Sequence, residues 1–305
     1  MKIGVNLLNF GPGVNPQALE SWIKISEALG YHLVMVSDHI AITPDVNSRY
    51  PAPFYEPFTT LGWIAGITTT MRIGTTVLIV PYRNPLETAK AAANLDQLSG
   101  GRLILGIGVG WSTEEFKVLG SPFKERGAVT NEYLTIMKRF WTEDVLSYDG
   151  TYIKFQDVRT APKPIQSPHP PISEGGQSHA AMERAVLHGD AYHPIRINTT
   201  WLSEQAIPKL TSIANQNERN MPAICPRIRL RITEYPMQED QRIAGEGSLG
   251  QIHEDLKKLE DLGCQYVLLD TYYDDVKATE NHEASWSMLS IFAEHIVDLR
   301  QEMVR

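Results

Sequence analysis

The stretch Leu98-Ser-Gly-Gly-Arg-Leu-Ile-Leu-Gly-Ile-Gly-Val-Gly-Trp111 decides the fold of this chain. It predicts a helix end, a Gly-Gly turn and an apolar strand that closes on glycines at positions 106, 108 and 110. Glycines gather at a strand's carboxyl end where the backbone curves sharply or lies close to a flat ligand. The spacing is G-x-G-x-G and not the G-x-G-x-x-G of dinucleotide crevices. We therefore expect a planar ligand outside a Rossmann fold; the alternative is that the glycines only relieve crowding and Trp111 packs as core.

Around this stretch, short runs rich in valine and isoleucine alternate with longer amphipathic segments, which indicates repeated strand–helix units. The expected strands are Lys2–Leu8, His32–Ser37, Arg72–Val80, Arg102–Gly108, Pro171–Gly175, Asp190–His193, Ile224–Thr233 and Tyr266–Thr271. The expected helices are Pro16–Leu29, Phe58–Thr69, Pro85–Leu98, Glu125–Trp141, Ser178–His188, Leu202–Asn217, Leu249–Leu262 and His282–Val304. Eight such units of even length favour a closed α/β TIM (β/α)8 barrel over an open doubly wound sheet.

The loops indicate which end of the barrel is elaborated. Gly30 and Gly263 follow the last apolar turns of two helices, as left-handed C-caps do, so the loops at the bottom of the barrel are tight. Long insertions follow strands 2 and 4, at Ile40–Pro57 and Ser112–Lys124, at the end where barrels hold their active sites. Residues 143–171 predict a hairpin with a type I′ turn at Asp149-Gly150 and a proline-rich connector. We interpret residues 1–305 as a single domain.

Composition excludes several classes of partner. The 305 residues carry a formal net charge of −8 without a concentrated basic face, so a nucleic acid ligand is not expected. Cys225 and Cys264 have no metal-site spacing and are interpreted as reduced core residues of a cytoplasmic protein. The chain enters a strand at once without an export segment, and no apolar run approaches the ~20 residues of a membrane span.

Two polar groups stand at expected strand ends. Asp38 and His39 follow strand 2, where an imidazole that titrates near neutrality could carry a proton and Asp38 could orient it or bind a ligand. The alternative is that Asp38 only caps the following loop. The segment Gly175-Gly176-Gln177-Ser178 precedes a helix and would present N–H groups to an anion, although short Gly-Gly turns are common.

Two further segments at this end carry less specific signals. Thr75-Thr76 on strand 3 is compatible with a bulge at the barrel mouth, although threonine also favours an ordinary buried strand. The aromatic residues and prolines between Ile40 and Phe58 could form a stiff wall over an apolar substrate, bury the loop or seal a subunit interface. The remaining histidines show no metal-ligand spacing, and no metal site is expected.

Ordered motifs carry a family resemblance over most of residues 1–195. They are V-S-D-H-I at 36–40, G-T-T-V-L at 74–78, P-Y-R-N-P-L at 81–86, the glycine stretch at 98–111 with its continuation to Gly127, W-T-E-D at 141–144, P-K-P-I-Q at 162–166, E-G-G at 174–176 and G-D-A-Y-H-P at 189–194. Together they resemble the bacterial luciferase-like monooxygenase family, and within it the subgroup assigned to the deazaflavin coenzyme F420. No single motif is decisive, whereas their order is specific.

The resemblance implies a barrel that binds an isoalloxazine or deazaisoalloxazine ring at the carboxyl ends of its strands, and a homodimer. It places a non-prolyl cis peptide behind the ring at Thr76–Val77 and backbone along the ring at Gly108, Val109 and Gly110. It places Asp38 and His39 near the reacting edge of the ring. The cofactor phosphate loop would be Gly175 and Gly176, with Gln177 beside them.

The expected activity is that of an oxidoreductase acting on a small organic substrate. Coenzyme F420, which passes a hydride, is favoured over FMN, which can activate dioxygen for monooxygenation. One branch of the family places a glutamate proton donor where this chain has Trp111, so His39 is the one candidate proton carrier. Two other hypotheses are a barrel hydrolase or aldolase with Asp38 and His39 as an acid–base pair, and a non-catalytic flavin-binding barrel.

Overall fold

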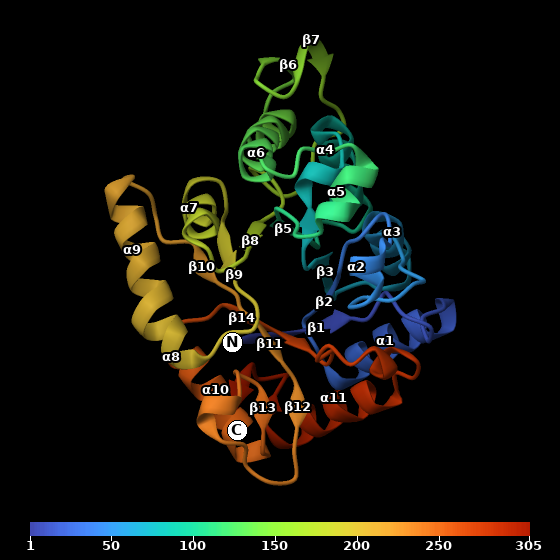
Figure 1. Cartoon of the computed structure of the whole chain (residues 1–305), viewed down its shortest axis with the longest axis vertical. Helices are drawn as coiled ribbons and strands as arrows, with labels where there is room; N and C mark the ends of the chain where they lie inside the picture. Colours follow the sequence, from blue (N-terminus) through green and yellow to red (C-terminus); the bar gives the residue numbers. More distant parts are fainter.

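The computed structural model describes every residue from Met1 to Arg305, with parallel strands at the centre and helices around them (Figure 1). The strands of the central sheet are β1 (Lys2–Leu7), β2 (Leu33–Val36), β3 (Arg72–Thr75), β4 (Leu78–Ile79), β5 (Leu103–Gly108), β8 (Ile172–Gly175), β9 (Ala191–His193), β10 (Ala223–Ile224), β11 (Arg227–Arg229) and β14 (Tyr266–Asp270). The helices are α1 (Pro16–Leu29), α2 (Pro44–Asn47), α3 (Pro57–Ile67), α4 (Pro85–Leu98), α5 (Thr113–Leu119), α6 (Arg126–Thr142), α7 (His179–Leu187), α8 (Thr199–Trp201), α9 (Ile207–Gln216), α10 (Leu249–Asp261) and α11 (Glu283–His295).

One segment of chain closes the barrel by pairing with both edges of the sheet. The parallel strands follow the order β10-β9-β8-β5-β3-β2-β1-β14-β11. At one edge β10 pairs with β9, and at the other β11 pairs with β14. Because β10 and β11 are consecutive halves of one segment, the order returns to its starting point. The predicted TIM barrel is confirmed.

Two predicted strands are interrupted where the chain cannot continue a ladder. The strand expected over Arg72–Val80 divides into β3 and β4 on either side of a cis peptide at Thr76–Val77. The strand expected over Ile224–Thr233 breaks at Pro226, which has no N–H to donate. Its final part, β12 (Arg231–Ile232), leaves the barrel and pairs with β13 (Glu246–Gly247).

Helix ends follow the capping residues. Asn15 accepts the N–H of Ala18 at the start of α1, and Gly30 ends this helix with φ of +91°. Gly263 after α10 has φ of +75°, so both predicted left-handed caps are confirmed. The prediction of a helix as far as Val304 is wrong. After α11, which ends at His295, the chain forms an antiparallel hairpin of β15 (Val297–Asp298) and β16 (Met303–Val304), and Glu302 before β16 has a φ of +55° that a right-handed helix does not allow.

The insertions lie where the sequence predicts them. Helix α2 lies in the insertion after β2, and α5 in the insertion after β5. The hairpin of β6 (Val145–Asp149) and β7 (Lys154–Arg159) projects from α6 at the top of Figure 1. Its two-residue turn is a wrong prediction, because Asp149 pairs with Lys154 and leaves a four-residue loop. The Glu132 carboxylate accepts three consecutive N–H groups of this loop and holds it open.

Two of the three buried apolar clusters make up most of the core. The larger, of 59 buried residues, includes side chains from both the strands and the surrounding helices. The smaller, called here the lumen cluster, consists of Leu33, Met35, Ile104, Ala191, Cys225, Tyr266 and Leu268. No helix combines the length and apolar character that crossing a membrane requires. The single-domain organisation of residues 1–305 stays a prediction.

Candidate active site

A cavity of about 240 Å³ opens at the carboxyl ends of the strands and gathers the predicted site residues. Its lining includes Asp38, His39, Thr76, Val77, Gly108, Val109, Gly110, Gly175 and Gly176. Gln177, the remaining predicted residue, does not line the cavity, because its Nε2 donates to the Ile195 carbonyl 2.5 Å away. Segments distant in sequence therefore meet at the carboxyl end of the strands, which is where TIM-barrel enzymes have their active sites. We call this space the upper cavity.

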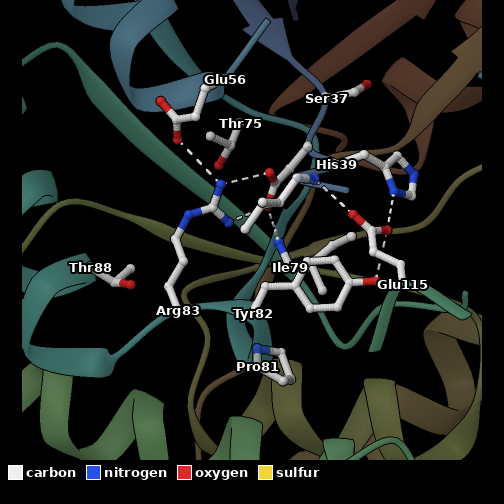
Figure 2. A network of polar contacts seen from close by, with 12 residues as sticks. Ser37, His39, Glu56, Thr75, Ile79, Pro81, Tyr82, Arg83, Thr88 and Glu115 are labelled. Carbon is white, nitrogen blue, oxygen red and sulfur yellow. Dashed lines mark hydrogen bonds and ion pairs between the residues drawn. The ribbon is translucent and has the colours of Figure 1, made fainter. Parts of the chain in front are cut away.

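His39 is held by a carboxylate that the sequence analysis did not assign. Its Nδ1 lies 2.6 Å from Oε2 of Glu115, which α5 brings over the end of β2 (Figure 2). Both side chains are almost fully buried. A hydrogen bond from Nδ1 to a carboxylate fixes the imidazole tautomer, as in other His–carboxylate pairs. Nε2 makes no hydrogen bond within the chain, and His39 lines the upper cavity.

Glu115 is fixed by donors from three directions. The backbone N–H groups of Ile40 and Ala41 donate to Oε1 at 2.7 and 3.0 Å, and the Tyr82 hydroxyl donates to Oε2 at 3.0 Å. Burial by itself would raise the pKa of the Glu115 carboxyl, but the His39 contact and the two N–H groups outweigh it and hold this pKa below its usual value. Burial and the neighbouring carboxylate raise the pKa of Tyr82, so its hydroxyl stays a donor.

Asp38 has a different partner from the one considered for it. Its two oxygens accept Nη1 and Nη2 of Arg83 at 2.6 and 2.8 Å, a bidentate pair, and Oδ2 also accepts the Ile79 N–H. Figure 2 shows the Arg83 guanidinium also facing Glu56. Asp38 therefore does not orient His39. Asp38 accepts the Ile79 N–H and so fixes the segment after the Thr76–Val77 peptide. This role is similar to the alternative prediction, in which Asp38 caps backbone N–H groups of a loop.

The wall formed by Thr76 and Val77 rests on a polar layer inside the barrel. The Thr76–Val77 peptide is cis, as the family resemblance implies. Arg227 Nη1 donates to the Thr76 carbonyl at 2.8 Å, and Arg227 pairs with Asp270. The Thr76 hydroxyl lies 2.9 Å from Nε2 of His193, whose Nδ1 lies 2.5 Å from the Cys225 carbonyl. Burial lowers the pKa of His193 to about 4, so this imidazole is neutral: Nδ1–H donates and Nε2 accepts.

The space beside Gly106 and Gly108 of β5, and beside Gly110 after it, is occupied by neighbouring residues of the chain. A Cβ atom at position 106 would lie 2.0 Å from the Thr75 carbonyl oxygen, and one at position 108 would lie 2.6 Å from Val77 Cγ2. Gly110 has φ of +81°, and a Cβ there would meet Ile79 and Phe116. At Gly106 the glycine therefore relieves crowding between neighbouring strands, which is the alternative to a close ligand. Gly108 and Gly110 also line the upper cavity, so backbone without side chains forms this wall.

The loop after β8 has the features of an anion site. Gly176 has φ of +108°, and the N–H groups of Gly176 and Gln177 make no hydrogen bond within the chain. Ser178 caps α7, the helix that follows, by accepting the Ala181 N–H. The loop thus presents backbone donors beside a helix N-terminus, where negative charge is favoured.

Aromatic rings cover the mouth of the upper cavity. Tyr50 stacks on His39 with ring centroids 5.5 Å apart, and Phe54 and Trp111 meet the same imidazole edge-on. Trp111 is 40% exposed, with the Arg49 guanidinium 5.3 Å from its ring. The loop after β2 therefore contributes Tyr50 to the cavity lining and buries its own aromatic residues, whereas a wall over an apolar substrate stays a prediction.

Sequence reasoning missed Glu115 and Arg227 as parts of this site. Glu114 and Glu115 are adjacent in the sequence, and nothing in their spacing shows that α5 directs Glu115 at His39 and leaves Glu114 exposed. A signal for Arg227 exists in the alternation of Arg227, Arg229 and Arg231, since alternate residues of a strand share a face. Two of them, Arg227 and Arg229, lie on β11 at the barrel mouth.

A family model described as luciferase-like monooxygenase matches residues 1–242. The chain belongs to the luciferase-like monooxygenase family. Its members among the relatives below are oxidoreductases that differ in cofactor.

Curated relatives in this family cover part of the chain. The FMNH2-dependent dimethylsulfone monooxygenase of Pseudomonas putida is 33% identical over 141 residues, 45% of this chain and 39% of that protein. The F420-dependent glucose-6-phosphate dehydrogenase of Intrasporangium calvum is 34% identical over 170 residues, 53% of this chain and 49% of that protein. The matches span between 39% and 65% of the length of these and other curated relatives.

A solved structure agrees over the whole fold. The coenzyme F420 dependent tetrahydromethanopterin reductase of Methanopyrus kandleri superposes with a TM-score of 0.78 and covers 99% of both chains. Its sequence is 17% identical, so this likeness supports the fold alone.

Proposed function

We propose that this chain is an oxidoreductase that binds coenzyme F420, with FMN as the alternative, and acts on a small organic substrate through His39. One observation carries the proposal. The hydrogen-bonded pair of His39 and Glu115 lies at a cavity lined by Val77 and by the backbone of Gly108–Gly110. A positioned imidazole beside a slot with backbone walls is the arrangement that chemistry on a flat ring requires.

The residues present fit a planar ring with an anionic tail. Val77 Cγ2 packs directly beside Gly108, so Val77 and the Gly108–Gly110 backbone together form one face of the cavity, against which a ring can lie. The unused N–H groups of Gly176 and Gln177 suit a phosphate on the tail. A reduced flavin or deazaflavin bound here supplies the two electrons for the reaction.

The protein's own groups handle the proton and the water. Glu115 accepts the Nδ1–H of His39, which leaves Nε2 to hold or give a proton at the substrate. Tyr50 and Trp111 close the mouth, and an apolar lid keeps water from the reacting centre. Asp38, joined to Arg83, acts indirectly by fixing the wall after Val77.

The choice of coenzyme F420 over FMN rests on the subgroup resemblance of the ordered motifs between residues 36 and 194. Relatives of both kinds match the chain, and Trp111 stands where the dehydrogenase branch has its glutamate. Fluorescence titration of purified protein with each cofactor tests the choice. We expect tighter binding of coenzyme F420; binding of FMN alone overturns this choice, and binding of neither overturns the proposed function.

The barrel hydrolase or aldolase is not proposed further. Family membership argues against it, and no group of three His, Cys, Asp or Glu side chains could hold a metal ion. The non-catalytic flavin-binding barrel remains the outcome if the protein binds a cofactor and turns over no substrate.

We also propose that the protein is a cytoplasmic homodimer whose copies meet through α3. Residues 58–71 contain no charged side chain, although Trp63 is 38% exposed and Ile67 is 44% exposed. Gly62 and Gly66 lie on the same exposed face with open space above their Cα atoms. An uncharged face with an exposed tryptophan is typical of subunit contacts.

A further inference from the structure

A second cavity lies at the opposite end of the barrel, where the strands begin. Its volume is about 850 Å³, compared with about 240 Å³ for the upper cavity. This lower cavity is large enough for a small organic molecule. Its lining includes Leu33, Ile104 and Tyr266 of the lumen cluster, so it reaches the interior of the barrel. The chemistry of TIM barrels takes place at the other end, and the proposed reaction does not use this space.

Arg72 is the unusual group in the lower cavity. It lies on β3 and is half-buried, and the single hydrogen bond of its side chain runs from Nη2 to Oε1 of Gln166 at 2.9 Å. No carboxylate lies within ion-pair distance of its guanidinium. Burial lowers the pKa of Arg72, and the nearby Asp96 carboxylate, which does not contact the guanidinium, offsets only part of this effect. Most donors of this guanidinium are therefore unused.

The other charged groups that line the cavity have partners or lie in solvent. The Met1 amine donates to the Glu302 carbonyl and lies 3.6 Å from Glu260. The Glu302 carboxylate lies 3.6 Å from His32, and that of Asp190 accepts the Ile172 N–H. Lys2 and Glu27 are exposed at the rim. Arg72 is thus the one partly buried cation that an added anion would neutralise.

The direction of Arg72 is fixed before any ligand arrives. The Gln166 amide that accepts from Arg72 donates to Asp96 Oδ1 at 2.7 Å and to the Leu103 carbonyl at 2.8 Å. Asp96 also accepts the backbone N–H groups of Ile165 and Gln166. A cation held in this way loses little freedom when it binds an anion, which favours affinity.

We propose that the lower cavity is a binding site for a small carboxylate with an apolar body. The carboxylate would pair with the Arg72 guanidinium, whose fork geometry matches it, and the apolar part would lie against Leu33 and Ile104. A doubly charged phosphate is disfavoured, because Glu27, Asp190 and Glu302 line the same cavity. The proposal does not depend on the function assigned to the upper cavity.

Calorimetric titration of the full chain with benzoate tests this site, with benzamide as the uncharged probe of the same shape. We expect saturable benzoate binding that weakens about ten- to a hundredfold in Arg72→Met, and benzamide binding as weak as that of benzoate to the variant. Arg159→Met removes an exposed arginine of β7 and should keep the wild-type affinity. Ala223→Leu, a half-exposed position on the cavity wall, should block binding with Arg72 still present.

A fourth variant separates the two cavities. Gly108→Ala narrows the upper cavity and should leave benzoate affinity unchanged. Absence of benzoate binding to the wild-type protein overturns the proposal. Equal affinity in wild type, Arg72→Met and Ala223→Leu, each shown by circular dichroism to be folded, also overturns it. So does binding that is lost in Gly108→Ala and kept in Arg72→Met, because that pattern places benzoate in the upper cavity.

Discussion

Nδ1 of His39 lies 2.6 Å from Oε2 of Glu115, a residue 76 positions later in the chain. The contact joins the end of β2 to α5, the helix that follows the glycine stretch. It gives the site a His–carboxylate pair without a glutamate at position 111. The insertion after β5 thus supplies the group that orients the proposed proton carrier.

Replacing Glu115 with glutamine should release His39 and destabilise the fold. Glutamine directs an NH2 group at donors that now meet a carboxylate, so we expect the unfolding free energy to fall by about 1–3 kcal/mol. The nitrogen NMR shifts of the His39 ring should change toward a mixture of tautomers. Glu114→Gln, an exposed neighbour on α5, should change neither quantity. Unchanged His39 shifts in Glu115→Gln would contradict the positioning role.

Replacing His39 with glutamine should separate chemistry from binding. Because His39 lies at the edge of the proposed ring site, cofactor affinity should stay within a few-fold of wild type. Turnover of any substrate found by screening small alcohols, ketones and sulfones should fall about 10²- to 10⁴-fold, the usual contribution of a general acid or base. Steady-state rates and cofactor titration on the same preparations check both. Full turnover in His39→Gln would contradict the assignment of His39 as the proton carrier.

Adding one methyl group at Gly108 should close the ring site. The new Cβ would lie 2.6 Å from Val77 Cγ2, so Val77 must move or the strands must part. We expect cofactor affinity to fall more than about tenfold and stability by about 1–3 kcal/mol. Gly250→Ala is the matched control, since nothing lies closer than 4.0 Å to a Cβ there. Wild-type cofactor affinity in Gly108→Ala would place the ring elsewhere.

His193 should make stability depend on pH on the acid side. Its pKa is about 4 in the folded protein against an ordinary histidine value of 6.5, so between these values the unfolded chain binds a proton that the folded chain does not. The contribution is fully present above about pH 6.5 and is lost as the pH falls toward 4, by up to about 3 kcal/mol. Denaturant unfolding from pH 7 to 4.5 should show this slope in wild type and a shallower one in His193→Gln. Parallel curves would contradict the assignment of a neutral, buried His193.

A charge on the exposed face of α3 should prevent dimer formation. Trp63→Glu places a carboxylate in the uncharged face, and we expect the dimer of the wild-type protein to become a monomer in sedimentation velocity. Tyr235→Glu, at another exposed aromatic residue, should leave the dimer intact. A monomeric wild-type protein would end the proposal.

The sequence was informative about the barrel because each strand–helix unit carries local signals. Gly30 and Gly263 end their helices as predicted, and the predicted residues from Asp38 to Gly176 meet at one cavity, because strand ends of a parallel barrel share a face. The breaks at Thr76–Val77 and Pro226 divide strands that apolar patterning shows as continuous. Patterning is insensitive to such local interruptions.

The sequence did not predict which side chains pair across the barrel. Asp38 stands next to His39 in the chain, yet its carboxylate pairs with Arg83, and a glutamate from α5 takes the expected place. Gly106 suggested a close ligand, whereas the Thr75 carbonyl of the neighbouring strand fills that space. Both outcomes depend on register between strands and on the path of an insertion, which no local spacing records.

A crystal structure of the protein with the cofactor that titrates tests the central claim most directly. The account predicts density for the ring against the face formed by Val77 and Gly108–Gly110, with His39 Nε2 at its open edge and the phosphate at the N–H groups of Gly176 and Gln177. Density for the ring in the lower cavity beside Arg72, or anywhere outside the lining of the upper cavity, would contradict it.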